Sequence, residues 1–180
     1  SQEIETGLDT LAIDLGLGYA ERLHSDAIEA WPQYVERYHL LQAARRAGAA
    51  FAFGEPLAWT DAARQPLAML SPEMHNRTIL DGVFRALGLT VVPAVETNSV
   101  MALVVGVQGG GAAAVLPGAV IATVAGQRGL VARPLVAPEV HTPICFMSAA
   151  SSRRSRALEA ALRLDGLADA ARHSGSLAPG

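Results

Sequence analysis

Cysteine is almost absent from this 180-residue chain, and its scarcity excludes a fold held together by disulfides. The one cysteine, Cys145, stands within the apolar run Pro143–Met147 and has no partner for an intrachain disulfide. We expect it to be a small buried hydrophobic residue in a cytoplasmic protein. The first residues, Ser1–Glu5, are acidic and polar, which is unlike a secretory signal peptide.

Basic charge is also scarce. The chain has 14 Lys and Arg against 17 Asp and Glu, for a net charge of −3. It therefore lacks the basic excess of a nucleic-acid-binding module, and any contact with DNA must come from another part of the polypeptide. Hydrophobic residues make up 51% of the chain, which is enough for a large core in one domain or one two-lobed domain.

No charged residue occurs between Thr97 and Gln127, a stretch long enough to span a membrane. Two interruptions, Gln108–Gly111 and Leu116–Gly118, break it into shorter pieces. A lipid-exposed helix tolerates such breaks poorly. We therefore expect a helix, a loop and a buried strand of a soluble core, with no membrane partner.

Recognisable catalytic motifs are missing. The sequence has no Gly-x-Ser-x-Gly elbow, no Walker loop and no His-Glu-x-x-His pair. Gly16 and Gly18 lack the third glycine of a dinucleotide fingerprint, since position 21 is Glu, and Gly109–Gly111 precedes a strand instead of a helix. We expect both glycine groups to be turns. No two histidines lie three or four apart on a predicted helix, so we expect no metal site, no cofactor and no catalytic residue.

The middle of the chain alternates strands and helices. Ser71-Pro72-Glu73 has the residues of a helix start, and Gly88 has the position of a helix stop. Alternation at these lengths predicts right-handed crossovers and a parallel sheet. The expected elements are a buried strand at Leu67–Leu70, a helix with Ile79, Leu80, Val83, Phe84 and Leu87 on one face, a strand at Val91–Val95, a helix at Val100–Val107 capped by Thr97-Asn98-Ser99 and covered on both faces, and a strand at Ala112–Leu116.

The flanking segments show weaker patterns. Arg133 and Pro134 fit the centre of a sheet poorly, so the strand around them should lie at an edge. The expected elements are the end of a helix at Ile4–Leu8, strands at Leu11–Leu15 and Tyr34–Leu41, a loop with one helical turn at Ala43–Ala63, an edge strand at Leu130–Val136, a buried strand at Ile144–Met147, a last helix from Ser151, and a mobile tail at 166–180.

Short polar residues gather at the predicted helix N-termini. Free backbone N–H groups and the positive end of the helix dipole make such places candidate anion sites. The alternative is that the side chains only cap the helices, and this alternative is favoured for Ser71 and Thr97. For Asn76 and Asn98 both interpretations stay open. The residues concerned are Ser71, Glu73, His75 and Asn76 at one helix, and Thr97, Asn98 and Ser99 at the next.

The order of these segments resembles a known family, the effector domains of LysR-type transcriptional regulators, from about Ile4 to Leu164. The resemblance lies in the order and spacing of four motifs. They are Leu11-Ala12-Ile13-Asp14-Leu15-Gly16-Leu17, similar to the family's LDLAI strand; Glu36-Arg37-Tyr38-His39-Leu40-Leu41, similar to its E-x-L-x-L-V crossover strand; Leu70–Arg77, similar to a ligand loop; and Glu96–Ser99 with the apolar helix, glycines and Val115-Leu116-Pro117 that follow.

This resemblance implies an α/β fold of two Rossmann-like lobes, as in type 2 periplasmic binding proteins, with a small effector between them. The first lobe would comprise 1–41 and 142–165, the second 42–141, and a flexible tail 166–180. The ligand-binding residues implied by position are Ser71, Met74, His75, Asn76, Asn98 and Pro117, with Leu17 and Gly18 from the first lobe.

The chain also departs from the family pattern. Family members begin with a winged helix-turn-helix and a linker helix, which are not in this sequence, and the first strand and helix of the first lobe are missing too. The resemblance implies that DNA would be contacted only through that absent N-terminal domain. It further implies a small-molecule effector, which the helix ends suggest is an anion or carboxylate, and self-association into a dimer or tetramer.

Two other functions fit parts of the pattern. One is a periplasmic-type solute-binding protein of the same fold, against which the missing signal peptide counts. The other is a small α/β enzyme that would use His75 with Glu73 or Ser71. We expect the sensing domain of a regulator and not an enzyme.

Overall fold

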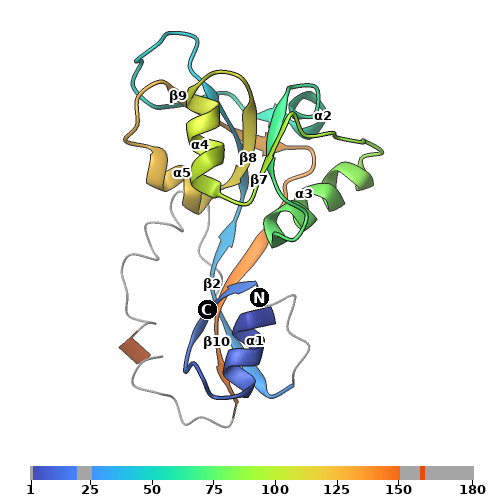
Figure 1. Ribbon diagram of the computed structural model, residues 1–180, viewed down its shortest axis with the longest axis vertical. Coiled ribbons are helices and arrows are strands. Elements are labelled where there is room, and N and C mark those ends of the chain that lie inside the picture. Colours follow the sequence, from blue (N-terminus) through green and yellow to red (C-terminus); the bar gives the residue numbers. More distant parts are fainter. Residues whose placement is uncertain (1, 20–25, 151–158, 161–180) are drawn as a thin grey trace. The chain divides into compact units, whose positions relative to one another are not determined.

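The computed structural model describes residues 2–19, 26–150 and 159–160, in two compact units (Figure 1). The first unit comprises Ser1–Glu36 and His141–Gly180, and the second comprises Arg37–Val140. The predicted last helix from Ser151 and the predicted tail at 166–180 lie outside the described residues, apart from a helical pair at 159–160. No helix in the described part is long and apolar enough to cross a membrane.

The second unit is built on a sheet whose main strand order is β4-β9-β3-β8-β6-β7. β6 runs parallel to β7 and to β8, as the alternation of strands and helices predicts, whereas β3 is antiparallel to β8 and β9. The boundary between the units precedes β3, because β3 pairs with strands of the second unit only. The strands are β3 (Tyr38–Ala43), β4 (Ala52–Phe53), β5 (Leu57–Ala58), β6 (Leu67–Leu70), β7 (Val95–Thr97), β8 (Ala113–Pro117) and β9 (Leu130–Val136).

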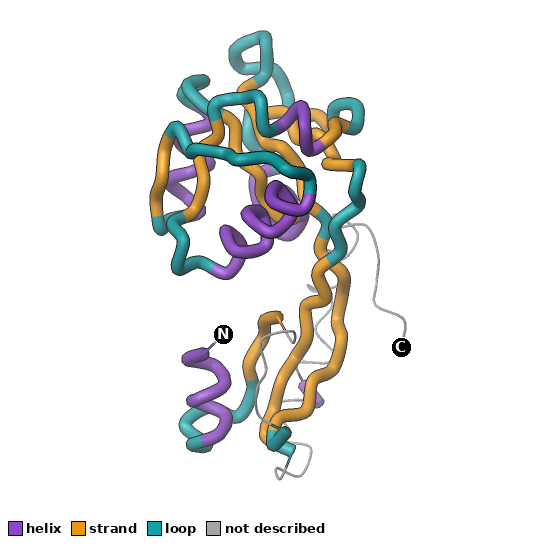
Figure 2. Tube along the Cα trace, turned by 90° about the vertical axis from the view of Figure 1, so that its right-hand side faces the viewer, coloured by secondary structure: helices purple, strands orange, loops and turns teal. Residues whose placement is uncertain are grey.

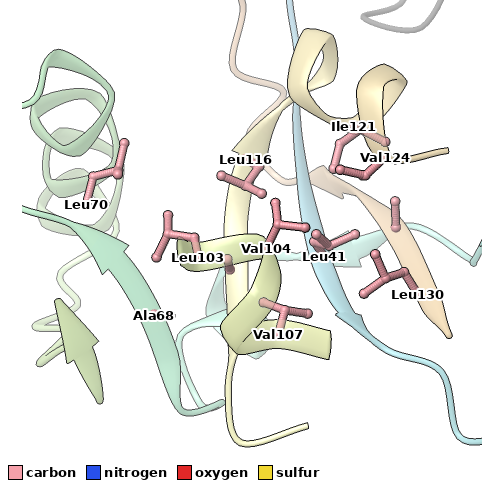
Figure 3. Close-up of a cluster of buried hydrophobic side chains, with 12 residues drawn as sticks. Leu41, Ala68, Leu70, Leu103, Val104, Val107, Leu116, Ile121, Val124 and Leu130 are labelled. Atoms are coloured by element: carbon pink, nitrogen blue, oxygen red, sulfur yellow. The ribbon is translucent and has the colours of Figure 1, made fainter. Parts of the chain in front are cut away.

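Two hydrophobic clusters cover the two faces of this sheet, because alternate residues of each strand point to opposite sides. On one face, α4 and α5 bury side chains against Leu41 and Leu116, as Figure 3 shows. On the other face, α2 and α3 bury Trp59, Leu80 and Phe84. The helices are α2 (Trp59–Ala62), α3 (His75–Ala86), α4 (Val100–Gln108) and α5 (Gly118–Val124).

Several predictions for the second unit are wrong. Ser71–Glu73 precedes the helix instead of starting it, because the N–H of Met74 bonds to the Ser71 carbonyl in a separate turn and α3 begins at His75. The strand predicted at Val91–Val95 is β7, Val95–Thr97; Pro93 has no N–H to donate, and pairing with β6 starts at Val95.

Strand β9 is not an edge strand, contrary to the prediction from Arg133 and Pro134. It lies between β3 and the short parallel strands β4 and β5. Each of those strands pairs with only two residues of β9 and leaves Arg133 and Pro134 unpaired on that side. The sheet therefore accommodates Arg133 and Pro134 because they lie between the residues of β9 that pair with β4 and those that pair with β5.

Helix α4 is also not covered on both faces. Leu103, Val104 and Val107 are buried in the cluster beneath the helix, but the side chains of Met101 and Val105 are 64% and 58% exposed. The absence of charged residues predicts that α4 is buried on every side. Among the described residues, other elements pack against one side of the helix only. An apolar helix face of this kind is typical of an interaction surface.

The first unit contains a three-stranded antiparallel sheet in the order β1-β10-β2, with α1 packed against it. Figure 2 shows the long strands β2 and β10 side by side. Central strand β10 buries Cys145 at 2% exposure, which confirms the prediction for this residue. The elements are α1 (Gln2–Asp9), β1 (Gly16–Tyr19), β2 (Ile28–Glu36) and β10 (Thr142–Ala149).

The prediction of a strand at Leu11–Leu15 is wrong. The N–H groups of Ala12 and Ile13 bond to the Gly7 carbonyl and close the end of α1, so the strand begins only at Gly16. Gly16 and Gly18 therefore lie in a strand and do not form the predicted turn. The segment Tyr34–Leu41, predicted as one strand, is divided at Arg37 between β2 and β3.

Gly16→Ala should destabilise the protein by about 1–3 kcal/mol, because an added Cβ would overlap the Cγ2 methyl of Ile4 in α1. The matched control is Gly82→Ala in α3, where an added Cβ meets nothing within 4 Å. This control should stabilise the protein by about 0.5–1 kcal/mol, since alanine favours a helix interior. Urea unfolding followed by circular dichroism measures both changes, and a neutral Gly16→Ala would contradict the packing of α1 on β1.

Candidate functional site

The carboxyl ends of β6, β7 and β8 meet at one edge of the second unit's sheet, because these strands run parallel. Ser71 and Asn98 directly follow β6 and β7, and Pro117 ends β8. The Ser71 N–H donates to the Thr97 carbonyl at 2.9 Å, which ties the first two loops together. Ligands of parallel α/β sheets usually bind at this edge. We call these loops, with the first turn of α3, the carboxyl edge.

Arg77 fixes the carboxyl edge from within α3. Its side chain is only 10% exposed, and its Nη1 donates to the Leu70 carbonyl at 2.8 Å and to Glu96 Oε2 at 2.9 Å. Its Nε donates to both carboxylate oxygens of Asp81, at 2.8 and 3.0 Å. One guanidinium therefore connects the end of β6, the strand β7 and the next turn of its own helix.

The charge of Arg77 is well compensated. Burial opposes the charged form, but the hydrogen bonds and charges of Asp81 and Glu96 outweigh it and raise the pKa of Arg77. Asp81 and Glu96 keep 36% and 46% of their side chains exposed, so the group is a bridge from the interior to solvent. Arg77 is a positioning residue whose donors are largely used by the protein.

The side chains of Ser71 and Glu73 form a hydrogen-bonded pair in the loop between β6 and α3. The Ser71 hydroxyl donates to Glu73 Oε1 at 2.8 Å. The backbone N–H of Glu73 and this hydroxyl both lower the pKa of the Glu73 carboxyl. A carboxylate with a lowered pKa is a weak base, so the pair offers poor activation of Ser71 as a nucleophile.

Met74, His75 and Asn76 occupy the beginning of α3 and are all half-buried. Met74 is the N-cap residue, makes no side-chain cap bond, and packs against the cluster beneath α4. Asn76 Nδ2 is buried and has no hydrogen-bond partner in the described part of the chain. An amide donor in this condition is a candidate ligand contact, because buried polar groups are normally paired.

In the loop after β7, the side chains of Thr97 and Ser99 bond to the backbone, whereas Asn98 is exposed. Ser99 Oγ accepts from the Ala102 N–H at 3.3 Å and caps α4, as predicted, and Thr97 Oγ1 accepts from the Ser99 N–H at 3.2 Å. Asn98 between them is exposed. Pro117 is buried and forms the N-cap position of α5. The Asn98 amide is therefore available to other partners, whereas the Thr97 and Ser99 hydroxyl oxygens accept from backbone N–H groups.

Leu17 and Gly18 belong to the first unit, where they lie in β1 opposite Phe146 and Cys145 of β10. Leu17 is 42% exposed. A Cβ on Gly18 would come within 3.3 Å of the Met147 Cε, so glycine permits close packing there. Their role in ligand binding stays a prediction.

Sequence reasoning missed Arg77, Asp81 and Glu96 as a group. The i, i+4 spacing of Arg77 and Asp81 on a predicted helix was the available signal. Glu96 and the Leu70 carbonyl come near Arg77 only through the pairing of β6 with β7, which no local pattern reveals. Among the described residues, no three His, Cys, Asp or Glu side chains are grouped so that they could hold a metal ion.

Comparison with known proteins gives one family. The model described as LysR substrate binding domain matches residues 1–164. No curated protein matches the sequence significantly.

Solved structures are similar over nearly the whole chain. HinK, a LysR family transcriptional regulator from Pseudomonas aeruginosa, has a TM-score of 0.68 and 21% identity over 97% of this chain and 57% of its own. The effector binding domain of QuiR in complex with shikimate has a TM-score of 0.69 and 16% identity over 97% and 78%. Full-length CbnR complexed with its target DNA has a TM-score of 0.70 and 19% identity over 97% and 57%.

The chain thus spans little more than half the length of HinK and CbnR. At these identities the likeness is evidence of fold. It confirms the predicted α/β architecture with two lobes like those of periplasmic binding proteins.

Arg77→Met should lower the free energy of unfolding by about 2–3 kcal/mol, because it leaves the Leu70 carbonyl and two carboxylates without their shared donor. The control is Arg64→Met, whose ion pair with Asp61 has exposures of 78% and 49% and should contribute about 0.5 kcal/mol. Urea unfolding measures both. Equal costs for the two variants would show that Arg77 does not hold the carboxyl edge.

Proposed function

The chain belongs to the LysR substrate-binding-domain family, and we propose that it is the effector-sensing part of a DNA-binding transcriptional regulator. The family is one of transcriptional regulators whose domains bind effectors.

The observation that carries the proposal is the unpartnered Asn76 amide at the carboxyl edge. Its buried Nδ2 lies in the first turn of α3, beside backbone N–H groups that have no partner within the helix. Asn98 offers a second amide from the neighbouring loop. Donors gathered at a helix N-terminus suit the oxygens of a small anion or carboxylate.

We propose such a carboxylate as the effector. QuiR was solved with shikimate, which carries a carboxylate and three hydroxyl groups, so a ligand of this kind can be held by a domain of this fold. Ser71, Met74, His75 and Pro117 would complete the contacts in the second unit, and Leu17 and Gly18 remain predicted contacts from the first. The effector would act by shifting the population of conformations of the protein.

DNA contact is proposed to lie outside this sequence, in an N-terminal helix-turn-helix domain. The net charge of −3 argues against a DNA-binding surface made by this chain alone. CbnR was solved with its target DNA, and this chain covers 57% of it. A regulator that acts on DNA works in the cytoplasm, which agrees with the single reduced cysteine.

The two alternatives are less well supported. An enzyme that used Ser71 would need an activating base, and its hydroxyl instead donates to a carboxylate of lowered pKa. A solute-binding protein would share the fold, but the family match is to regulators.

The exposed apolar side of α4 supports self-association. Met101 and Val105 are one helical turn apart and lie in a stretch without charge. Burial of such a face in a dimer or tetramer would remove apolar surface from water.

Thermal-shift screening of the intact chain against small carboxylates, shikimate included, should identify a stabilising ligand. Asn76→Ala should then weaken its binding about tenfold or more in calorimetry, since a paired amide donor is lost. Thr78→Ala, an exposed change on the same helix, should leave the affinity unaltered. If Asn76→Ala binds the ligand as well as the wild type does, the carboxyl edge is not the effector site.

Met101→Lys should shift the protein toward monomers in sedimentation velocity, because a charge would be buried at the proposed interface. Thr60→Lys on α2, whose helix packs on the opposite face of the sheet, should leave the oligomer intact. An unchanged oligomer in Met101→Lys would remove α4 from the interface.

A further inference from the structure

Arg37 lies between β2 and β3, and His39 is the second residue of β3, so the two are only two positions apart along the backbone. Within β3 itself, alternate side chains point to opposite sides of the sheet. Tyr38 and Leu40 point into the cluster beneath α2 and α3, whereas Leu41 belongs to the cluster beneath α4 and α5. His39 therefore lies on the α4–α5 face. This is the opposite face from α3, where Asn76 lies.

Each of these side chains has a buried nitrogen with no hydrogen-bond partner in the parts of the chain that the structure describes. The atoms are Arg37 Nε and His39 Nδ1. His39 is buried, with only 6% of its surface exposed. The guanidinium Nε always carries a proton, and Nδ1 carries one in the protonated ring and in one neutral tautomer. The Arg37 charge acts on His39, so the two side chains are near neighbours, and two buried nitrogens that can both donate are candidates to bind one acceptor group.

The neighbours of His39 within the sheet carry no charge, whereas two carboxylates lie close to Arg37, those of Glu36 directly before it in the chain and of Glu139. In the sheet, His39 is flanked by Leu116 of β8 and Pro134 of β9, and α5 carries no ionisable side chain. Glu139 approaches the Arg37 Nη2 to 3.9 Å, with both side chains about half exposed, and this weak contact does not involve Nε. Burial and the Arg37 charge lower the pKa of His39 to about 4. A nearby anion would oppose both effects, because its charge favours the protonated ring.

An aromatic side chain covers the imidazole. The ring of Phe53 in β4 lies 5.9 Å from the ring of His39, at an angle of 57°, and contacts Phe51 edge to face at 5.3 Å. Phe53 itself is 51% exposed, which is unusual for phenylalanine. His39 therefore adjoins an apolar side chain that water still reaches.

We propose that Arg37 and His39 form an anion site on the second unit for a small organic monoanion, a carboxylate whose apolar body packs against Phe53. The anionic oxygens would accept from Arg37 Nε and His39 Nδ1 and satisfy both nitrogens at once. Glu139 competes for Arg37 and limits the affinity. This site does not depend on the effector site at the carboxyl edge.

The first test is nuclear magnetic resonance of the imidazole nitrogens in the intact chain, with benzoate as the probe at pH 7. Benzoate should shift the His39 signals, and the neutral analogue benzamide should not. Benzenesulfonate stays anionic in acid and serves for a pH series. It should raise the pKa of His39 above about 4, and its binding should tighten as the pH falls from 7 to 5, because the protonated ring adds a donor and a charge.

Three variants sharpen the test. Arg37→Met keeps an apolar stem of similar length and should weaken benzoate binding about tenfold. Glu139→Gln removes the competing carboxylate and should strengthen binding about twofold. Arg46→Met changes an exposed arginine in the loop after β3 and should have no effect.

The proposal is overturned if benzoate leaves the His39 signals in place, or if benzamide binds as well as benzoate. Equal affinities in Arg37→Met and Arg46→Met would also overturn it. Should Arg37→Met fail to fold, the spectra of the wild type and of Glu139→Gln decide the question alone.

Discussion

The guanidinium of Arg77 is the interaction on which the second unit's polar edge depends. It holds the Leu70 carbonyl at the end of β6, Glu96 in β7 and Asp81 one turn further along α3. Without it, the two loops that follow β6 and β7 would keep the backbone bond from Ser71 to Thr97 and the short pairing of the strands. The arrangement is that of a rigid scaffold presenting polar loops, which is how binding proteins keep their sites in place.

Much of the fold could be predicted from the sequence where hydrophobicity alone decides it. Strand β6 and the buried strand β10 are apolar runs of the expected lengths, and α4 begins at the serine that caps it. The failures have a common cause in tertiary contacts. Strand β9 accommodates Arg133 because β4 and β5 each pair with two residues of it, and α3 starts late because Ser71 is used in a turn. The partners of Arg77 could not be predicted, since sheet pairing brings them together.

Three buried nitrogens distinguish the candidate binding places from the rest of the polar interior. Asn76 Nδ2, Arg37 Nε and His39 Nδ1 have no partner among the described residues, whereas Arg77 is bonded at Nε and Nη1. Buried donors are normally satisfied, so their occurrence at the carboxyl edge and at Arg37 and His39 points to ligands. The exposed side of α4 is the apolar counterpart of these places, because it offers surface that a second chain can cover.

We propose that this domain senses a small carboxylate and that a DNA-binding domain elsewhere in the regulator responds to it. The most direct test of this proposal is fluorescence anisotropy of the full-length regulator on DNA from upstream of its own gene, titrated with each carboxylate that binds the isolated chain. We expect that at least one of them changes the affinity for DNA and is recovered chemically unaltered. DNA binding that is indifferent to every such ligand, or turnover of the ligand by the protein, would contradict it.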